Sequence, residues 1–342
     1  MINREIIRIK VVQLTYAHYQ NGTHKLDTAE KELFFSLSKA YDLYIYMLQL
    51  MVDLNHMAER TLETATNRAR RLGERLPSSK FVDNQFIAQL TANNQLQEIV
   101  TSQKKTWADD EDFVRRLWKC ISDSEIYKEW MDNPEQPTYE EDRDLWRRIY
   151  KNIIAENEEL DQLLEDKSLY WNDDRFIVNT FVLKTINRFD AKAGRNQELL
   201  PEYRDDDDRE FAKRLFRASL LGAETYRGVI SQFLRNWDLS RIAFMDLVIL
   251  QTALAEMLTF PQIPVTVTIN EYVNIAKFYS TPRSGSYING MLDAIARSLI
   301  AEGRLKKEMP GQEPVSFEES EFSESPETSK SSETTESSET TE

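Results

Sequence analysis

Cysteine and histidine are nearly absent from this chain of 342 residues, which holds one Cys and three His. The single thiol, Cys120, provides neither a disulfide within the chain nor a cysteine-ligated zinc site, and it is typical of a reduced cytoplasmic protein. His18, His24 and His56 are too few and too dispersed to form a metal cluster. We therefore expect no metal site.

Glycine and proline are also scarce, with nine and ten residues, which favours long helices over hairpins. Neither GxGxxG nor GxxxxGKS/T occurs in the chain. A phosphate-binding glycine loop is therefore excluded, because such a loop needs the backbone to approach its ligand closely. The sequence predicts an all-α protein without a cofactor.

Membrane-spanning and secretory segments are lacking as well. The first ten residues alternate charged and apolar side chains, unlike a signal peptide. The most apolar stretch, residues 33–54, includes Lys39, Asp42 and Asp53, and charges near the middle of a membrane span are costly. We interpret this stretch as a buried helix and expect a cytoplasmic protein without membrane contact.

Most of the net charge of −15 lies at the C-terminal end of the chain. Residues 308–342 contain eleven Glu and one Lys and supply −10, so the remainder is only mildly acidic. No broad basic surface is implied, and any RNA site must be local. The Ser/Thr/Glu-rich tail, residues 305–342, is expected to be disordered. It either guards against nonspecific RNA contact or only improves solubility.

Helical periodicity extends over nearly all of the remaining chain. It predicts a first helix over residues 4–20. A second helix begins at a capping box formed by Asp27 and Glu30 and ends near Arg71. Further amphipathic helices are predicted over 80–200, one of them capped by Thr138 and Glu141. Five tryptophans of this region fall at helical spacing and are interpreted as core residues rather than as a base-stacking stripe: Trp107, Trp118, Trp130, Trp146 and Trp171.

The last third of the folded chain has the most regular pattern. Four aspartates, residues 205–208, precede an apolar helix that is predicted over 211–233. Acidic side chains are favoured at this place because the N-terminus of a helix carries a partial positive charge. A second helix over 242–257 is followed by an extended bridge, 263–267. Thr268 and Glu271 then cap a third helix to about Tyr279, and a final helix runs to Ala301.

Three ordered blocks of this region resemble the NusB transcription antitermination family. The blocks read WDLSRIAFMDLVILQTALAEM, IPVTVTINEYVNIAKFY and SGSYINGMLDAI. The residues at family-like positions are Trp237, Arg241, Asp246, Ile249, Leu250 and Glu256, then Pro264, Val267, Ile269, Asn270, Glu271, Val273, Ala276 and Lys277, then Ser284, Tyr287, Asn289, Gly290, Leu292 and Asp293. Together they cover about a hundred residues, from Asp205 to Arg304.

The N-terminal helix resembles the arginine-rich helix with which the family begins. The positions that fit are Arg4, Arg8, Val12, Gln13 and Tyr16, whereas Glu5 and Ile6 stand where further arginines are expected. The resemblance divides the chain into a NusB-like N-terminal part, 1–55, a helical insertion or extension, 56–204, and a NusB-like helical module, 205–304, before the tail. The expected fold is a NusB-like helical bundle with a large helical insertion.

The resemblance implies a non-catalytic adaptor that binds boxA, a short single-stranded RNA element of ribosomal RNA leaders. It binds jointly with the small-subunit ribosomal protein that doubles as the elongation factor NusE. The pair joins other Nus factors on the RNA polymerase elongation complex and suppresses premature termination. Such a protein needs no cofactor.

The resemblance and the chemistry of the side chains together give a set of candidate site residues. Arginine donates in pairs to phosphates and base edges, and tyrosine can stack on a base. The RNA-binding candidates are Arg4, Arg8, Gln13, Tyr16 and Arg283. Asp246 and Tyr287 stand where the family meets its ribosomal partner. Arg4 and Arg8 are one turn apart, and phosphate contacts would offset their mutual repulsion.

Two alternatives remain open. NusB-like domains also occur fused to RNA cytosine methyltransferases, although this chain offers no cysteine pair and no cofactor loop. The second alternative is a helical protein-interaction scaffold that does not bind RNA. The incomplete arginine pattern of the N-terminal helix supports it.

Overall fold

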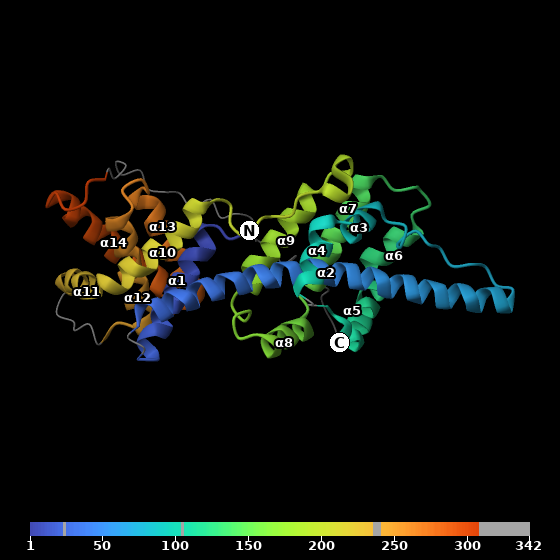
Figure 1. Ribbon diagram of the computed structural model, residues 1–342, viewed down its shortest axis with the longest axis horizontal. Coiled ribbons are helices and arrows are strands. Elements are labelled where there is room, and N and C mark those ends of the chain that lie inside the picture. Colours follow the sequence, from blue (N-terminus) through green and yellow to red (C-terminus); the bar gives the residue numbers. More distant parts are fainter. Residues whose placement is uncertain (23–24, 104–105, 235–240, 308–342) are drawn as a thin grey trace, which may run out of the picture. The chain divides into compact units, whose positions relative to one another are not determined.

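The computed structural model describes residues 1–22, 25–103, 106–234 and 241–307, and these ranges form an all-α protein (Figure 1). Within them the only extended pairing is an isolated parallel bridge between Ile2 and Tyr203. Residues Met1–Glu308 make one compact unit. The predicted tail lies outside the described residues after Lys307, as does Trp237.

The chain begins with α1 (Arg4–Gln20) and the 47-residue helix α2 (Leu26–Leu72). The helices that follow are α3 (Gln85–Thr91), α4 (Asn94–Gln103), α5 (Glu111–Asp123), α6 (Glu125–Asp132), α7 (Tyr139–Ile149), α8 (Glu158–Lys167) and α9 (Arg175–Arg188). A π-helical turn, Tyr150–Ile154, continues α7, and short 3-10 turns cover Ala108–Asp110 and Ala191–Asn196. The C-terminal helices are α10 (Asp206–Leu221), α11 (Ala223–Gln232), α12 (Phe244–Thr259), α13 (Val265–Tyr279) and α14 (Ser284–Ala301).

The C-terminal helices pack around α12, which is apolar on nearly every side and therefore buried. α12 contacts α10, α11, α13 and α14, and α1 lies against α10, α12 and α13. None of the described helices is both long enough and apolar enough to cross a lipid bilayer.

α2 joins the N-terminal and C-terminal helices to the middle of the chain. It contacts α1 and α10 on one side and α3, α4, α5 and α9 further along (Figure 1). At 1.5 Å per residue it is about 70 Å long, and it ends at Gly73, whose positive φ of 69° closes the last turn. The boundary expected at residues 55/56 falls inside this continuous helix, so no linker separates the two segments there.

Most predicted helix limits are confirmed. α1, the end of α2 and the end of α14 agree to within one residue, and Thr138 with Glu141 forms the predicted capping box of α7. Four of the five tryptophans are buried as predicted: Trp107, Trp118, Trp146 and Trp171. Trp130 is half-buried, with Lys80 4.8 Å from its ring centre.

Two predicted helix starts are wrong because the capping side chains have other partners. Asp27 and Glu30 pair with Arg217 of α10 instead of capping α2, which starts at Leu26 after Lys25 and has no side-chain cap. α13 starts directly after Pro264, so the extended bridge over 263–267 is absent. Thr268, the predicted cap of α13, lies inside the helix and donates to Glu256.

The single helix predicted over 211–233 is two helices, with a break at Gly222. A Cβ at this position would lie 2.4 Å from Cζ of Tyr226, one turn later. Glycine therefore lets the Tyr226 ring fold back against the backbone between α10 and α11.

The middle of the chain is attached to α1 through buried polar contacts. Lys10 pairs with Asp174, the residue that precedes α9, at 2.6 Å, and both side chains are almost completely buried. Gln13 donates to the neighbouring Asp173 at 3.1 Å. Burial raises the pKa of Asp174 to about 6, although the Lys10 ammonium acts in the opposite direction. The Lys10 ammonium therefore balances the negative charge of a carboxylate that solvent does not reach.

Lys10→Met is expected to destabilise the protein by about 3–5 kcal/mol, because it leaves this carboxylate buried without its counter-ion. Without the Lys10 ammonium, the folded-state pKa of Asp174 rises above the wild-type value of about 6. A carboxyl with a raised folded pKa loses stability as the pH increases towards that pKa. Urea unfolding should therefore show a larger Lys10→Met penalty at pH 8 than at pH 5.

The matched control is the double substitution Lys10→Met with Asp174→Leu, which removes both charges and should recover most of the stability. Equal penalties for Lys10→Met at both pH values would contradict the role given to the pair.

Candidate functional site

A cavity of about 630 Å³ lies where α11, α12 and α14 approach one another. Three predicted site residues, Asp246, Arg283 and Tyr287, line it together. The rest of the described lining is mostly apolar and comprises Phe233, Leu234, Ile242, Ala243 and Met291, with Arg241, Thr281 and Ser284. Apolar walls with a few convergent polar groups are the usual composition of a binding site.

Asp246 acts mainly as a support for one wall of this cavity. It lies in the first turn of α12, is 6% exposed, and accepts hydrogen bonds from the hydroxyls of Ser280 at 2.6 Å and Ser284 at 2.9 Å. Ser284 also accepts a hydrogen bond from the backbone N–H of Thr281. The carboxylate therefore fixes the turn between α13 and α14, which carries Arg283.

Arg283 and Tyr287 are the predicted residues that remain accessible at the cavity. Arg283 is exposed at the start of α14, and no hydrogen bond or ion pair holds its guanidinium within the described part of the chain. Tyr287 is half-buried one turn later, and its pKa is raised by burial and then by the negative charge of Asp246. The cavity thus combines an exposed cation, a neutral phenol and an apolar floor.

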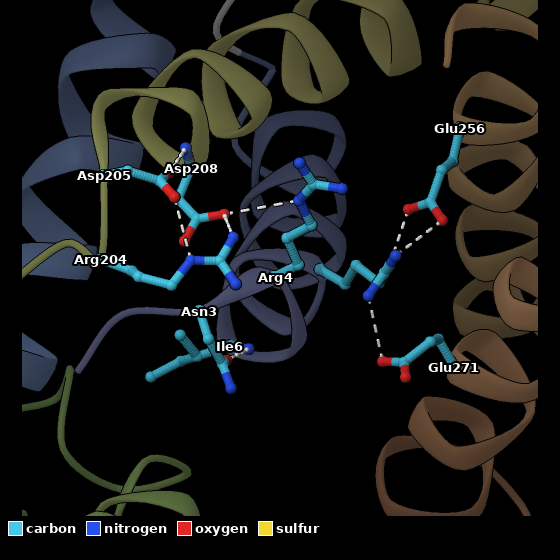
Figure 2. A network of polar contacts seen from close by, with 9 residues as sticks. Asn3, Arg4, Ile6, Arg204, Asp205, Asp208, Glu256 and Glu271 are labelled. Carbon is cyan, nitrogen blue, oxygen red and sulfur yellow. Dashed lines mark hydrogen bonds and ion pairs between the residues drawn. The ribbon is translucent and has the colours of Figure 1, made fainter. Parts of the chain in front are cut away.

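The predicted arginines of α1 both pair with carboxylates of the same chain (Figure 2). Arg4 lies 3.4 Å from the carboxylate of Asp208 in α10, with its guanidinium 5.0 Å from the ring centre of Phe211. The guanidinium of Arg8 lies 5.5 Å from the same ring centre and pairs with Glu256 of α12 and Glu271 of α13. Arg4 keeps 34% of its side chain exposed, whereas Arg8 is 4% exposed as a residue.

Arg8 forms a buried network with two glutamates. Its Nε and Nη2 donate to both carboxylate oxygens of Glu256, at 2.8 and 3.0 Å, and Nη1 lies 3.2 Å from Glu271. Glu256 also accepts from the hydroxyls of Thr268 at 2.9 Å and Tyr272 at 3.2 Å. Burial alone would lower the pKa of Arg8, but the hydrogen bond and charge of Glu256 raise it overall.

The RNA contact expected of Arg8 stays a prediction, and the structure shows what it would have to displace. The donors of Arg8 are used by carboxylates in the core, and a phosphate cannot replace them without opening the contacts of α1 with α12 and α13. The repulsion between Arg4 and Arg8 is offset by Asp208, Glu256 and Glu271, where phosphates were expected.

Gln13 and Tyr16 also have partners within the protein. Gln13 donates to Asp173, and the ring of Tyr16 packs against Phe244 with the centres 5.2 Å apart. Both side chains are half-buried, and neither lines the cavity. The structure therefore brings Asp246, Arg283 and Tyr287 together but places the α1 candidates elsewhere.

The sequence prediction missed the apolar part of the cavity. Phe233, Ile242 and Met291 belong to the helical periodicity that also marks the core, so their positions alone do not separate cavity lining from core packing. Only the convergence of three helix ends distinguishes them, and this follows from tertiary structure.

Comparison with known proteins relates the chain to one family. The NusB family model matches residues 179–297. The transcription antitermination protein NusB of Salinibacter ruber is 38% identical over 132 residues, which cover 37% of this chain and 82% of the relative. The chain belongs to the NusB family.

Other NusB proteins align over a smaller share of their length. The protein from Syntrophotalea carbinolica is 44% identical over 90 residues, 26% of this chain and 58% of the relative. A solved structure of T. maritima NusB is covered over a larger share, 90% of that chain and 44% of this one, with 29% identity and a TM-score of 0.27. The relatives from Salinibacter ruber and Syntrophotalea carbinolica are both named as transcription antitermination proteins.

The NusB family match includes the whole described lining of the cavity, from Phe233 to Met291, and also the second half of α9. It therefore begins inside the segment, 56–204, that was expected to be an insertion. α1 lies outside residues 179–297, so the family model itself gives no assignment for Arg4 and Arg8.

Arg8→Ala should destabilise the protein by about 3–5 kcal/mol, because it leaves the Glu256 carboxylate buried and uncompensated. Arg8→Lys retains the charge but loses the paired donors, so an intermediate loss is expected. Urea unfolding of the variants measures both values. If Arg8 instead served RNA from an exposed position, Arg8→Ala would change the free energy of unfolding by less than about 0.5 kcal/mol.

Proposed function

We propose that this chain is a transcription antitermination factor that binds boxA-like single-stranded RNA together with the ribosomal small-subunit protein NusE. In this proposal the pair acts in the RNA polymerase elongation complex with other Nus factors, and the chain itself catalyses no reaction. The relationship to named antitermination proteins supports the role, and the resemblance of the three C-terminal blocks supplies the RNA and protein partners.

The cavity between α11, α12 and α14 is the observation that carries the proposal. It gathers Asp246, Arg283 and Tyr287 inside the stretch that matches the family model. We assign Tyr287 and the apolar floor to the ribosomal partner, with Asp246 holding the turn in place. Arg283 is assigned to RNA phosphate, because its exposed guanidinium lacks a partner within the described residues.

A shared RNA site fits the charge of the protein better than binding by this chain alone. Residues 1–307 carry a net charge of −5, so long-range attraction of RNA is weak. Arg4, Gln13 and Tyr16 remain proposed secondary contacts, since each keeps part of its side chain accessible. A basic partner that completes the site would supply the missing positive charge.

The test compares RNA binding by the full chain with and without NusE. A boxA-containing RNA should bind more tightly than its scrambled version only when the ribosomal protein is present. Arg283→Ala should weaken the three-component complex about tenfold, as expected for loss of one charge-assisted hydrogen bond. Fluorescence anisotropy of labelled RNA measures both effects.

Arg297→Ala is the matched control, because Arg297 is an exposed arginine of the same helix that pairs with Asp293 at 2.8 Å. It should leave binding unchanged. Equal affinity of boxA and scrambled RNA in the presence of the partner would contradict the proposal.

A protein-interaction scaffold without RNA binding is the second candidate function. The observation that favours it is the pairing of Arg4 and Arg8 with carboxylates of the same chain. A scaffold predicts that NusE or another protein binds at the cavity while no RNA arm of the test gives a signal.

A further inference from the structure

The C-terminal end of α2 carries a group of exposed arginines that the cavity does not involve. Residues 59–72 form the last turns of α2, and nearly all of their side chains are exposed or half-buried. The arginines of this end are Arg60, Arg68, Arg70 and Arg71, with Arg75 directly after the helix, and we call them the α2 arginine group.

The α2 arginine group is a local reversal of the charge of the protein. Residues 59–75, which contain the whole group, have five Arg and three Glu (Glu59, Glu63 and Glu74) and therefore carry +2. Residues 1–307 together carry −5. Such a concentration of one sign at an exposed end produces a local positive potential that the net charge does not reveal.

Most of these guanidiniums are not used to stabilise the fold. Arg60 pairs with Glu111 at 3.0 Å, and Arg71 donates to the carbonyl of Asn67 in its own helix. Arg68, Arg70 and Arg75 have no hydrogen bond or ion pair in the part of the chain that the structure describes. Their donors are therefore available to a ligand.

Interaction with the helix dipole accounts for only part of this group. Cations in the last turn of a helix are favourable, which applies to Arg70 and Arg71. Arg68 lies before that turn and Arg75 after the helix, where this effect has fallen off. The helix dipole therefore does not explain why a chain that is acidic overall has four arginines in the eight-residue stretch 68–75.

A groove along α2 extends the same surface. A hollow of about 510 Å³ between α2 and α5 is lined by Arg60, Arg68 and Arg115, with Glu111 as its single acidic residue. Glu111 lies within 3.5 Å of both Arg60 and Arg115, and Asp112 pairs with Arg115 at 2.8 Å, so Arg68 is the groove arginine without an acidic partner among the described residues. The groove therefore keeps an excess of positive charge directly beside the α2 arginine group.

We propose that the end of α2, with the groove beside α5, binds the phosphate backbone of single-stranded RNA without regard to its sequence. Arg60, Arg68 and Arg71 share one face of the helix, and eleven residues at 1.5 Å each span about 16 Å. A row of this length is sufficient for several consecutive phosphates. Arginine suits this role because its planar fork donates two hydrogen bonds to a phosphate.

Nucleic acid fits this surface better than a lipid membrane does. A helix that lies in a membrane interface needs a continuous apolar face opposite its charges. Here the exposed apolar side chains near the arginines are Leu72 and Leu76, which do not form such a face. Phosphate contacts position RNA without reading its bases, which would let this end hold RNA that passes beyond the cavity.

The test uses the full chain, without NusE, and an unstructured oligouridine RNA that contains no boxA element. The variant replaces Arg68, Arg70, Arg71 and Arg75 by Gln. Each phosphate contact to a single strand contributes about 0.7 to the slope of log K against log salt. The variant should therefore bind at least tenfold more weakly at low salt, with a slope smaller by about 3.

A charge-matched control replaces Arg116, Arg147, Arg148 and Arg297 by Gln. These four arginines lie on α5, α7 and α14; Arg116 and Arg297 are exposed, Arg147 and Arg148 are half-buried, and removing all four lowers the net charge by the same amount. Binding by this control should stay within about twofold of wild type, because each of its arginines is already paired with a carboxylate. Circular dichroism confirms that both variants are folded.

Three results would overturn the proposal. Equal loss in the two variants would mean that only net charge matters, and unchanged binding by the α2 variant would place the contact elsewhere. Tighter binding of wild type to phosphatidylserine vesicles or to poly-glutamate than to RNA would assign the surface to a membrane or to an acidic protein. Because neither boxA nor NusE is present, these outcomes do not depend on the function proposed for the cavity.

Discussion

The buried ion network between Arg8 and the glutamates Glu256 and Glu271 is the interaction on which the arrangement of the NusB-like helices depends. Arg8, which is 4% exposed, joins α1 to α12 and α13 and neutralises the charge of Glu256 (Figure 2). The Glu256 carboxylate accepts four hydrogen bonds, two from Arg8 and one each from the hydroxyls of Thr268 and Tyr272. A buried pair of this kind adds little net stability compared with apolar residues, but it strongly penalises arrangements that separate its partners. It therefore fixes which helices α1 contacts.

This constraint determines where a ligand can bind. Because α1 uses Arg8 for the core, and Gln13 and Lys10 for contacts with the middle of the chain, the helix acts mainly as a connecting element. Accessible chemistry is found instead at helix ends, at the cavity near Arg283 and at the exposed end of α2. A protein with little positive charge overall can bind RNA only at such local sites.

The sequence alone predicted the helical class and most helix limits, because periodicity is a local property. It also named Asp246, Arg283 and Tyr287 as site residues, but that they line one cavity follows from the tertiary structure. It failed where one side chain had two possible partners. Asp27, Glu30 and Thr268 fit local capping patterns, yet each pairs with a residue distant in sequence. Arg8 likewise has the spacing of an exposed arginine, and its burial follows from Glu256, 248 residues away.

The most direct test of this account is to map where RNA touches the intact protein. Photo-crosslinking of a boxA-containing RNA to the full chain with NusE, followed by mass spectrometry, identifies the modified peptides. We expect crosslinks in the turn and first part of α14, around Arg283 and Tyr287, and at the end of α2, around Arg68 to Arg75. Crosslinks concentrated on the α1 peptide that contains Arg8, with none at these two places, would contradict the account.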